Sequence, residues 1–154
     1  MNKLLKVLAL GVLALGFVAT AGAAERATLD EAKAMVKKAR AYIREVGPEK
    51  AFAEFSNPKG RFVDRELYVF VNDKTGVNLA HGANPRLIGK NLMELRDTDG
   101  IYMTKQFFGV ASKGGGTVDY KFLNPATKAI EAKTAYVEME GEYVVGSGIF
   151  RAAK

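Results

Sequence analysis

One histidine, His81, has the broadest chemical range of any residue in this sequence, and it lies in the stretch NLAHGANPRLIGKNL at residues 78–92. An imidazole can transfer protons, ligate a metal, hydrogen-bond a ligand or pack as a ring. A structural zinc site needs about four nitrogen or sulfur ligands, but the chain has no cysteine and no second histidine. We therefore predict no metal site. His81 is then either one wall of a pocket or a structural residue that holds a loop.

Residues suited to catalysis are sparse. The serines are Ser56, Ser112 and Ser147, and the Gly-Ser-Gly step around Ser147 lacks the full Gly-x-Ser-x-Gly nucleophile motif. The acidic segment DTDG at residues 97–100 is only a fragment of a calcium loop. No pair of carboxylates has a separation that the sequence fixes. We predict a protein that is not an enzyme and that carries no cofactor.

The first 23 residues have the layout of a secretory signal peptide. Lys3 and Lys6 precede an apolar run at residues 7–18, and the small residues Ala21-Gly22-Ala23 follow it. We expect cleavage near Ala24 and a periplasmic or otherwise exported protein. The alternative is a retained leader, which would be the only contact with the membrane, because no later segment is apolar for about 20 residues.

The remaining chain has the size of one domain, and its charge narrows the class of partner. The net charge is +6, and two of the positive charges belong to the leader. The basic residues form no stripe interleaved with aromatics, which argues against nucleic acid as a partner. The excess of positive charge weakly favours anionic ligands. Stability must come from packing, because a chain without cysteine forms no disulfide.

Hydrophobic periodicity predicts an α+β fold. A long amphipathic helix capped by Thr28 or Asp30 should run to Val46, with a further helical turn or two up to Phe55. Period-two segments predict strands at residues 66–73, 77–82, 117–122, 129–139 and 142–150, and helices are expected at 91–97 and 99–113. The five strands should form one antiparallel sheet.

The segments YVFVNDKTGVNLAHGANPRLIGKNL, GGGTVDYKFLNPA and KTAYVEMEGEYVVGSGIF, in this order and spacing, resemble the single Cache domain. This family is the extracytoplasmic, PAS-like sensor module of bacterial chemoreceptors and histidine kinases. The resemblance covers residues 28–150. It implies a long N-terminal helix on one face of the sheet, and a pocket on the other face covered by the middle helices and loop. It further implies a small organic ligand, often a short carboxylate.

Lys133 is the foremost candidate for contact with that ligand. It interrupts an apolar strand, and it occupies the lysine position of the family's "K..YV" stretch. A lysine buried there without a partner would have a lowered pKa, and a bound carboxylate would restore its charge. The alternative is a lysine at a solvent-facing edge whose stem merely passes the sheet.

The other candidates are weaker. Tyr136 lies on the opposite strand face from Lys133, so it would join the pocket only through a bulge and otherwise packs toward the long helix. Tyr68 either offers a hydroxyl from the first strand to one side of the pocket or packs in the core. Second-tier candidates on the helix over the pocket are Tyr102, Gln106 and Phe107, of which Phe107 is most simply core. At the start of the covering loop, His81 could hold the loop with one ring nitrogen and donate to a ligand with the other.

These observations predict a periplasmic domain that binds a small organic anion. The sequence ends four residues after the last predicted strand, so we expect no output domain and a separate membrane receptor or kinase as partner. The alternative is an interaction or scaffold protein of the cell envelope whose pocket is closed by its own side chains. A partly polar cavity at Lys133 and His81 would favour the first reading, and a closed apolar core the second.

Overall fold

Helix α1 (Leu29–Val46) begins at a capping box in which the side chain of Thr28 accepts from the backbone N–H of Glu31. The Glu31 carboxylate accepts in return from the backbone N–H of Thr28. The structure is a computed structural model, and it describes residues 25–151. The predicted leader at residues 1–23 lies outside this range. Gly47 ends α1, and Pro48 starts helix α2 (Pro48–Phe55), as a proline at the first helical position can.

The strands form the predicted five-stranded antiparallel sheet, in the order β4-β3-β7-β6-β5. Its long strands follow one another at the C-terminal end of the chain, and hairpin turns connect them. The strands are β3 (Phe70–Asn72), β4 (Asn78–His81), β5 (Gly116–Leu123), β6 (Ile130–Glu140) and β7 (Tyr143–Arg151). Two short strands, β1 (Val63–Asp64) and β2 (Leu67–Tyr68), pair separately just before β3. The predicted first strand is thus divided between two sheets.

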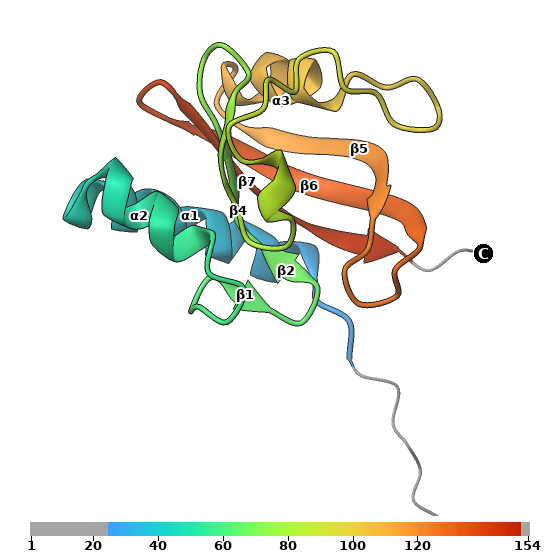
Figure 1. Ribbon diagram of the computed structural model, residues 1–154, viewed down its shortest axis with the longest axis horizontal. Coiled ribbons are helices and arrows are strands. Elements are labelled where there is room, and N and C mark those ends of the chain that lie inside the picture. The colour runs from blue at the N-terminus through green and yellow to red at the C-terminus, as the bar shows by residue number, and fades with distance from the viewer. Residues whose placement is uncertain (1–24, 152–154) are drawn as a thin grey trace, which may run out of the picture.

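The helices cover opposite faces of the sheet (Figure 1). α1 and α2 lie on one face, and helix α3 (Met103–Ala111) lies on the other. Each face has its own apolar core. The α1-side core consists of Val36, Ala39, Ile43, Ala51, Phe55, Phe62, Val69, Val71, Ala80 and Val145. The α3-side core consists of Tyr68, Phe70, Met103, Phe107, Ala111, Val118, Tyr120, Ala135, Val137, Val144 and Phe150.

The prediction of a helix at residues 91–97 is wrong. This segment forms turns, and the helical turn nearby is instead the 3₁₀ helix η1 (Pro85–Leu87). The side chain of Asn91 accepts from the backbone N–H of Met93, and Asp97 accepts from Asp99 and Ile101. Such local acceptors compete with helical hydrogen bonds. For the same reason α3 starts at Met103 and not at residue 99.

Candidate functional site

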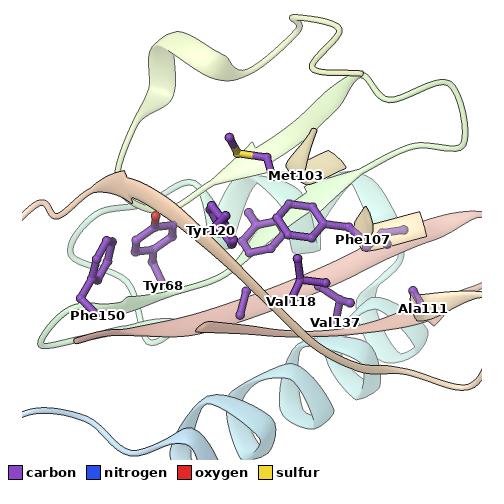
Figure 2. Packing of buried hydrophobic residues seen from close by; sticks show 11 residues of the cluster. Tyr68, Met103, Phe107, Ala111, Val118, Tyr120, Val137 and Phe150 are labelled. Atoms are coloured by element: carbon purple, nitrogen blue, oxygen red, sulfur yellow. The ribbon is translucent and has the colours of Figure 1, made fainter. Parts of the chain in front are cut away.

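Lys133 is fully buried on the α3 side of β6, where its exposed fraction is 0%. Its Nζ donates a hydrogen bond to the hydroxyl oxygen of Tyr68 at 2.7 Å. Five aromatic ring centroids lie 4.0 to 5.9 Å from Nζ, those of Tyr68, Phe70, Tyr120, Phe122 and Phe150. Figure 2 shows Tyr68, Tyr120 and Phe150 on this side of the sheet, with α1 beneath it. We call these five rings the aromatic cage.

Burial lowers the pKa of Lys133 from its ordinary value of 10.5 to about 7. The ring faces attract a cation, but this attraction is weaker than an ion pair with a carboxylate. Among residues 25–151 no aspartate or glutamate forms an ion pair with Lys133, and its hydrogen bond goes to a neutral hydroxyl. The domain therefore holds a buried amine that would gain from a bound anion.

His81 lies at the end of β4 and is also buried, with an exposed fraction of 5%. Its Nδ1 accepts hydrogen bonds from the backbone N–H groups of Ala83 and Asn84, at 3.3 and 2.9 Å. Burial, and secondly the charge of Lys133, lower the pKa of His81 to about 3. The ring is therefore neutral at physiological pH, and its proton is on Nε2. One nitrogen holds the loop, which leaves Nε2–H as a donor.

Two hollows meet at His81 and Phe122. The inner cavity, between the sheet and α3, has a volume of about 20 Å³, which is room for about one water molecule. It is lined by Phe70, Asn72, Asn78, His81, Leu87, Leu92, Leu95, Met103, Thr104, Phe107, Tyr120 and Phe122. The outer pocket has a volume of about 220 Å³ and is lined by Tyr68, His81, Ala83, Asn84, Arg86, Phe122, Leu123, Pro125 and Lys128. Three rings of the aromatic cage, Phe70, Tyr120 and Phe122, also line the inner cavity.

Sequence reasoning missed two buried polar residues of this cavity, Asn72 and Asn78, each with an exposed fraction of 1%. Residues 78 and 81 would lie on opposite faces of a regular strand. The pairing of β3 with β4 shifts register between Val71 and Asn72, and both Asn78 and His81 then line the inner cavity. The presence of asparagine inside two alternating strands could have indicated a polar site. The bulge that turns Asn78 toward the cavity could not be predicted, because alternation of apolar and polar residues does not reveal a bulge.

Three predicted site residues lie elsewhere. Tyr136 packs against the α1-side core and donates to Glu138 Oε1 at 2.6 Å, because no bulge interrupts the pairing of β6. Tyr102 is half-buried, with the charged ends of Arg96 and Lys105 over its ring. Gln106 is exposed on the outer surface of α3.

The remaining predicted residues are brought together. Lys133 and Tyr68 share a hydrogen bond, and the rings of Tyr68 and His81 have centroids 4.7 Å apart. Phe107 is a core residue, 5.0 Å from Phe70 between ring centroids, and it lines the inner cavity. Within residues 25–151 no group of three or more histidine, cysteine, aspartate or glutamate side chains could hold a metal ion. In the same range, no helix has the length and apolar character to cross a membrane.

An antiparallel sheet with a long helix on one face and a buried, partly polar cavity on the other is the architecture of PAS-like sensor domains. The family model of single Cache domain 2 matches residues 11–151, and the chain belongs to this family. The match begins within the predicted leader, so the domain boundary at residue 28 stays a prediction.

Two relatives of this chain are a chemoreceptor and a sensor kinase. The methyl-accepting chemotaxis protein McpP of Pseudomonas putida KT2440 is 29% identical over 90 residues, 56% of this chain and 16% of that protein. The sensor histidine kinase MctS of Rhizobium johnstonii is 33% identical over 88 residues, 56% of this chain and 19% of the kinase. This chain is therefore homologous to extracytoplasmic sensing modules, but the match spans less than a fifth of either relative.

Solved structures agree with this assignment. A methyl-accepting chemotaxis protein from Vibrio parahaemolyticus superimposes with a TM-score of 0.69 at 25% identity, over 79% of this chain and 86% of that one. A second structure, described as the structural basis for carboxylic acid recognition by a Cache chemosensory domain, gives a TM-score of 0.68 at 24% identity. It covers 80% of this chain and 92% of that one. The fold is that of the Cache sensor domains.

Proposed function

We propose that this chain is a periplasmic sensor domain that binds a short organic anion, a carboxylate, beside Lys133. The observation that carries the proposal is the fully buried amine of Lys133, whose one hydrogen-bond partner among the described residues is the Tyr68 hydroxyl. A carboxylate would supply the missing negative charge and accept hydrogen bonds from the ammonium. The neighbouring Nε2–H of His81 is a second donor for the same ligand.

Lys133 lines neither hollow, so binding requires that the inner cavity enlarge and extend to the aromatic cage around the amine. A ligand of about four to six non-hydrogen atoms needs more room than a site for about one water molecule. One wall of the cavity, formed by Leu87, Leu92 and Leu95, comes from the irregular segment between β4 and α3. This segment contains η1 and turns but none of the five strands, so its displacement would leave the sheet intact. The outer pocket, with Arg86 and Lys128 in its lining, is the approach by which an anion would arrive.

The small volume of the inner cavity favours a second candidate function. An envelope interaction or scaffold protein would keep its pocket filled by its own side chains, and about 20 Å³ is close to filled. In that case Lys133 would be a relic of a binding site. Titration with ligands separates the two candidates, because only a sensor domain responds to them.

The test is calorimetric titration of the purified protein with acetate and propionate, and with acetamide and propionamide as neutral counterparts. Ligands of this size should bind with dissociation constants between tens of micromolar and about one micromolar at best. Lys133→Met should weaken the acids by about 10- to 150-fold, because it removes one charge-assisted contact. The matched control is Lys37→Met, the same change at an exposed position of α1. Equal binding of the amides, or full affinity in Lys133→Met, would remove the lysine as anchor.

The same proposal includes the compartment of the protein and its partner. Cleavage of the leader near Ala24 would release the domain into the periplasm, and a membrane receptor or sensor kinase would read its bound state. Cell fractionation with N-terminal sequencing tests the first part. A chain that keeps Met1 and sediments with the membrane would make the protein a tethered domain.

A further inference from the structure

The large apolar side chains that are exposed in residues 25–151 lie in two segments of the fold. Ile88 and Leu95 precede α3, and Leu123 and Ile130 are partners at the end of the β5–β6 pair. Leu123 is 45% exposed and Ile130 is 55% exposed. Leu95, Leu123 and Ile130 line one groove with a volume of about 290 Å³, and we call these three residues the apolar patch. Single exposed apolar residues are ordinary, but a cluster of them marks an interaction surface.

Basic side chains surround the apolar patch. Within the described residues, the groove and the adjoining outer pocket are lined by four basic residues and by a single acidic residue, Asp97. Both carboxylate oxygens of Asp97 accept hydrogen bonds from backbone N–H groups of the domain itself. Lys121 forms an ion pair with Asp99, whereas the other three basic residues form none within residues 25–151. These three are Arg86, Arg96 and Lys128. The surface therefore attracts an anionic partner.

The combination of the apolar patch with basic residues favours a membrane surface over a second copy of the chain. A second copy docked symmetrically would bring the same basic residues face to face, and like charges repel. An anionic phospholipid surface instead offers phosphate groups to the basic residues and an apolar layer to the leucine and isoleucine side chains.

The position of residue 25 supports the same orientation. Glu25 lines a hollow together with Asn124, Ala126 and Thr127 of the β5–β6 turn. This turn connects two members of the apolar patch, Leu123 and Ile130. The predicted leader, with its apolar run, lies immediately upstream of residue 25. A chain whose leader is in the membrane would therefore have the β5–β6 turn, and with it part of the apolar patch, close to the bilayer.

We propose that the apolar patch docks on an anionic phospholipid membrane, with Leu123 and Ile130 inserted at the boundary between headgroups and acyl chains and Lys128 beside the lipid phosphates. Lys128 is exposed in the turn between these two residues, so it reaches the headgroup layer when they insert. Binding of this kind grows with the buried apolar area and with the number of nearby basic residues, and it is reversible when both are small. Such docking does not depend on the proposed ligand site.

The experiment is flotation of the mature chain, beginning at Ala24, with vesicles of phosphatidylglycerol and phosphatidylcholine in equal parts, or of phosphatidylcholine alone. Without the leader, no apolar segment outside the domain can anchor the protein. The protein should float with the mixed vesicles at low salt, and high salt should weaken the binding. The partition coefficient should be at least about tenfold lower with phosphatidylcholine alone, because the unpaired basic residues then lose their anionic partners. Equal partition into both kinds of vesicle would overturn the proposal. Absence of flotation would also overturn it, and would favour an acidic protein surface as the occupant.

Three variants locate the binding surface. The double variant Leu123→Ser, Ile130→Ser leaves the net charge unchanged and should lower the partition coefficient by about tenfold or more, because it removes the inserted apolar area. Lys128→Gln should lower the partition coefficient by about 3- to 10-fold, because it removes one positive charge near the anionic surface. The matched control is Lys50→Gln, the same change at an exposed position of α2 on the opposite face of the sheet, and it should have little effect.

Two results with these variants would contradict the proposal. Unchanged binding of the double serine variant would show that the net positive charge alone holds the protein at the vesicle. Equal losses in Lys128→Gln and Lys50→Gln would place the binding elsewhere on the molecule. If the double variant fails to fold, which near-ultraviolet circular dichroism detects, the two lysine variants still decide the proposal.

Discussion

The tip of the Phe70 ring lies against Gly146, its partner across the β3–β7 pair, so closely that a Cβ on Gly146 would be 2.6 Å from Phe70 Cε2. The ring of Phe70 is at once a member of the aromatic cage and a wall of the inner cavity. Because glycine has no side chain, position 146 leaves room for the Phe70 ring, and this room determines how far the ring extends into the inner cavity.

Gly146→Ala should push Phe70 toward the cavity and destabilise the fold. Overpacking of a dense core costs about 1 to 3 kcal/mol, and urea denaturation measures it. The control is Gly109→Ala in α3, where an added Cβ meets nothing within 4 Å. That change should stabilise the protein by up to about 1 kcal/mol through helix propensity. Similar losses in both variants would contradict the tight contact.

Two tyrosine-to-phenylalanine changes should show which face of the sheet binds the carboxylate. Tyr68→Phe removes the hydroxyl that accepts from Lys133, and at pH 6, where the amine is charged, it should cost about 1.5 to 3 kcal/mol for a hydrogen bond to a charged group. Tyr136→Phe removes a half-buried hydroxyl on the α1 side that donates to the Glu138 carboxylate, and it should cost no more than about 1.5 kcal/mol, because water can reach both partly exposed groups. Binding of carboxylates should change only in Tyr68→Phe. A loss of affinity in Tyr136→Phe would restore that residue to the site.

The amine of Lys133 should make stability depend on pH between 7 and 9. Its pKa is about 7 in the folded protein against an ordinary 10.5, so the unfolded chain binds the extra proton in this window. Stability should therefore rise with pH by about 1 kcal/mol per unit. In Lys133→Met this rise should be absent, and the variant should be more stable than wild type at pH 7 by a margin that shrinks toward pH 9. Urea denaturation of both proteins at pH 7, 8 and 9 measures the margin. A constant margin would mean that the lysine stays charged when folded.

His81 should make the stability of the protein depend on pH in the acidic range. Its pKa is about 3 when folded against 6.5 ordinarily, so acid protonates the unfolded chain first, and stability falls as the pH drops below 6.5. Between pH 6.5 and 5 the loss from this group should be about 1 to 2 kcal/mol. His81→Asn has no such proton to bind and should lose less stability over the same interval. Equal acid sensitivity in the two proteins would show that the imidazole is accessible to protons in the folded state.

The two nitrogens of His81 can be tested separately. An asparagine oxygen can replace Nδ1 as acceptor, and a glutamine amide can replace the Nε2–H donor. His81→Asn should therefore keep the backbone amides of Ala83 and Asn84 protected from hydrogen exchange while weakening the ligand. His81→Gln should expose those amides and retain more of the affinity. If both variants lose protection equally, the ring holds the loop by packing and not by its acceptor.

Lys133 shows what the sequence can predict. The strict alternation of an eleven-residue strand assigns Lys133, Ala135 and Val137 to one face, and the structure confirms this assignment. The same alternation places Tyr136 on the other face. The cage around Lys133 could not be predicted in this way, because its rings come from four strands whose registers are set by tertiary pairing.

Asn78 and the segment at residues 91–97 show where pattern reading fails. A bulge changes the face of every residue beyond it, and it depends on hydrogen bonds between β3 and β4 that one strand's sequence does not contain. Leu92 and Leu95 have helical spacing, but the segment forms turns because Asn91 accepts from the Met93 N–H and Asp97 accepts from the Ile101 N–H; both leucines line the inner cavity from these turns. Both failures concern the wall of the candidate site, where local chemistry overrides periodicity.

The alternation of β6 has a consequence for how this strand tolerates change in length. On its α3 side the strand carries Lys133, and on its α1 side it carries Glu138 and Glu140, which form ion pairs with Arg40 of α1. Deleting one residue between positions 133 and 138 would exchange the faces of everything on one side of the deletion. Either the amine or the ion pairs would then be on the wrong side of the sheet. Deleting two residues would preserve both assignments, so length variants of this strand should be viable only in steps of two.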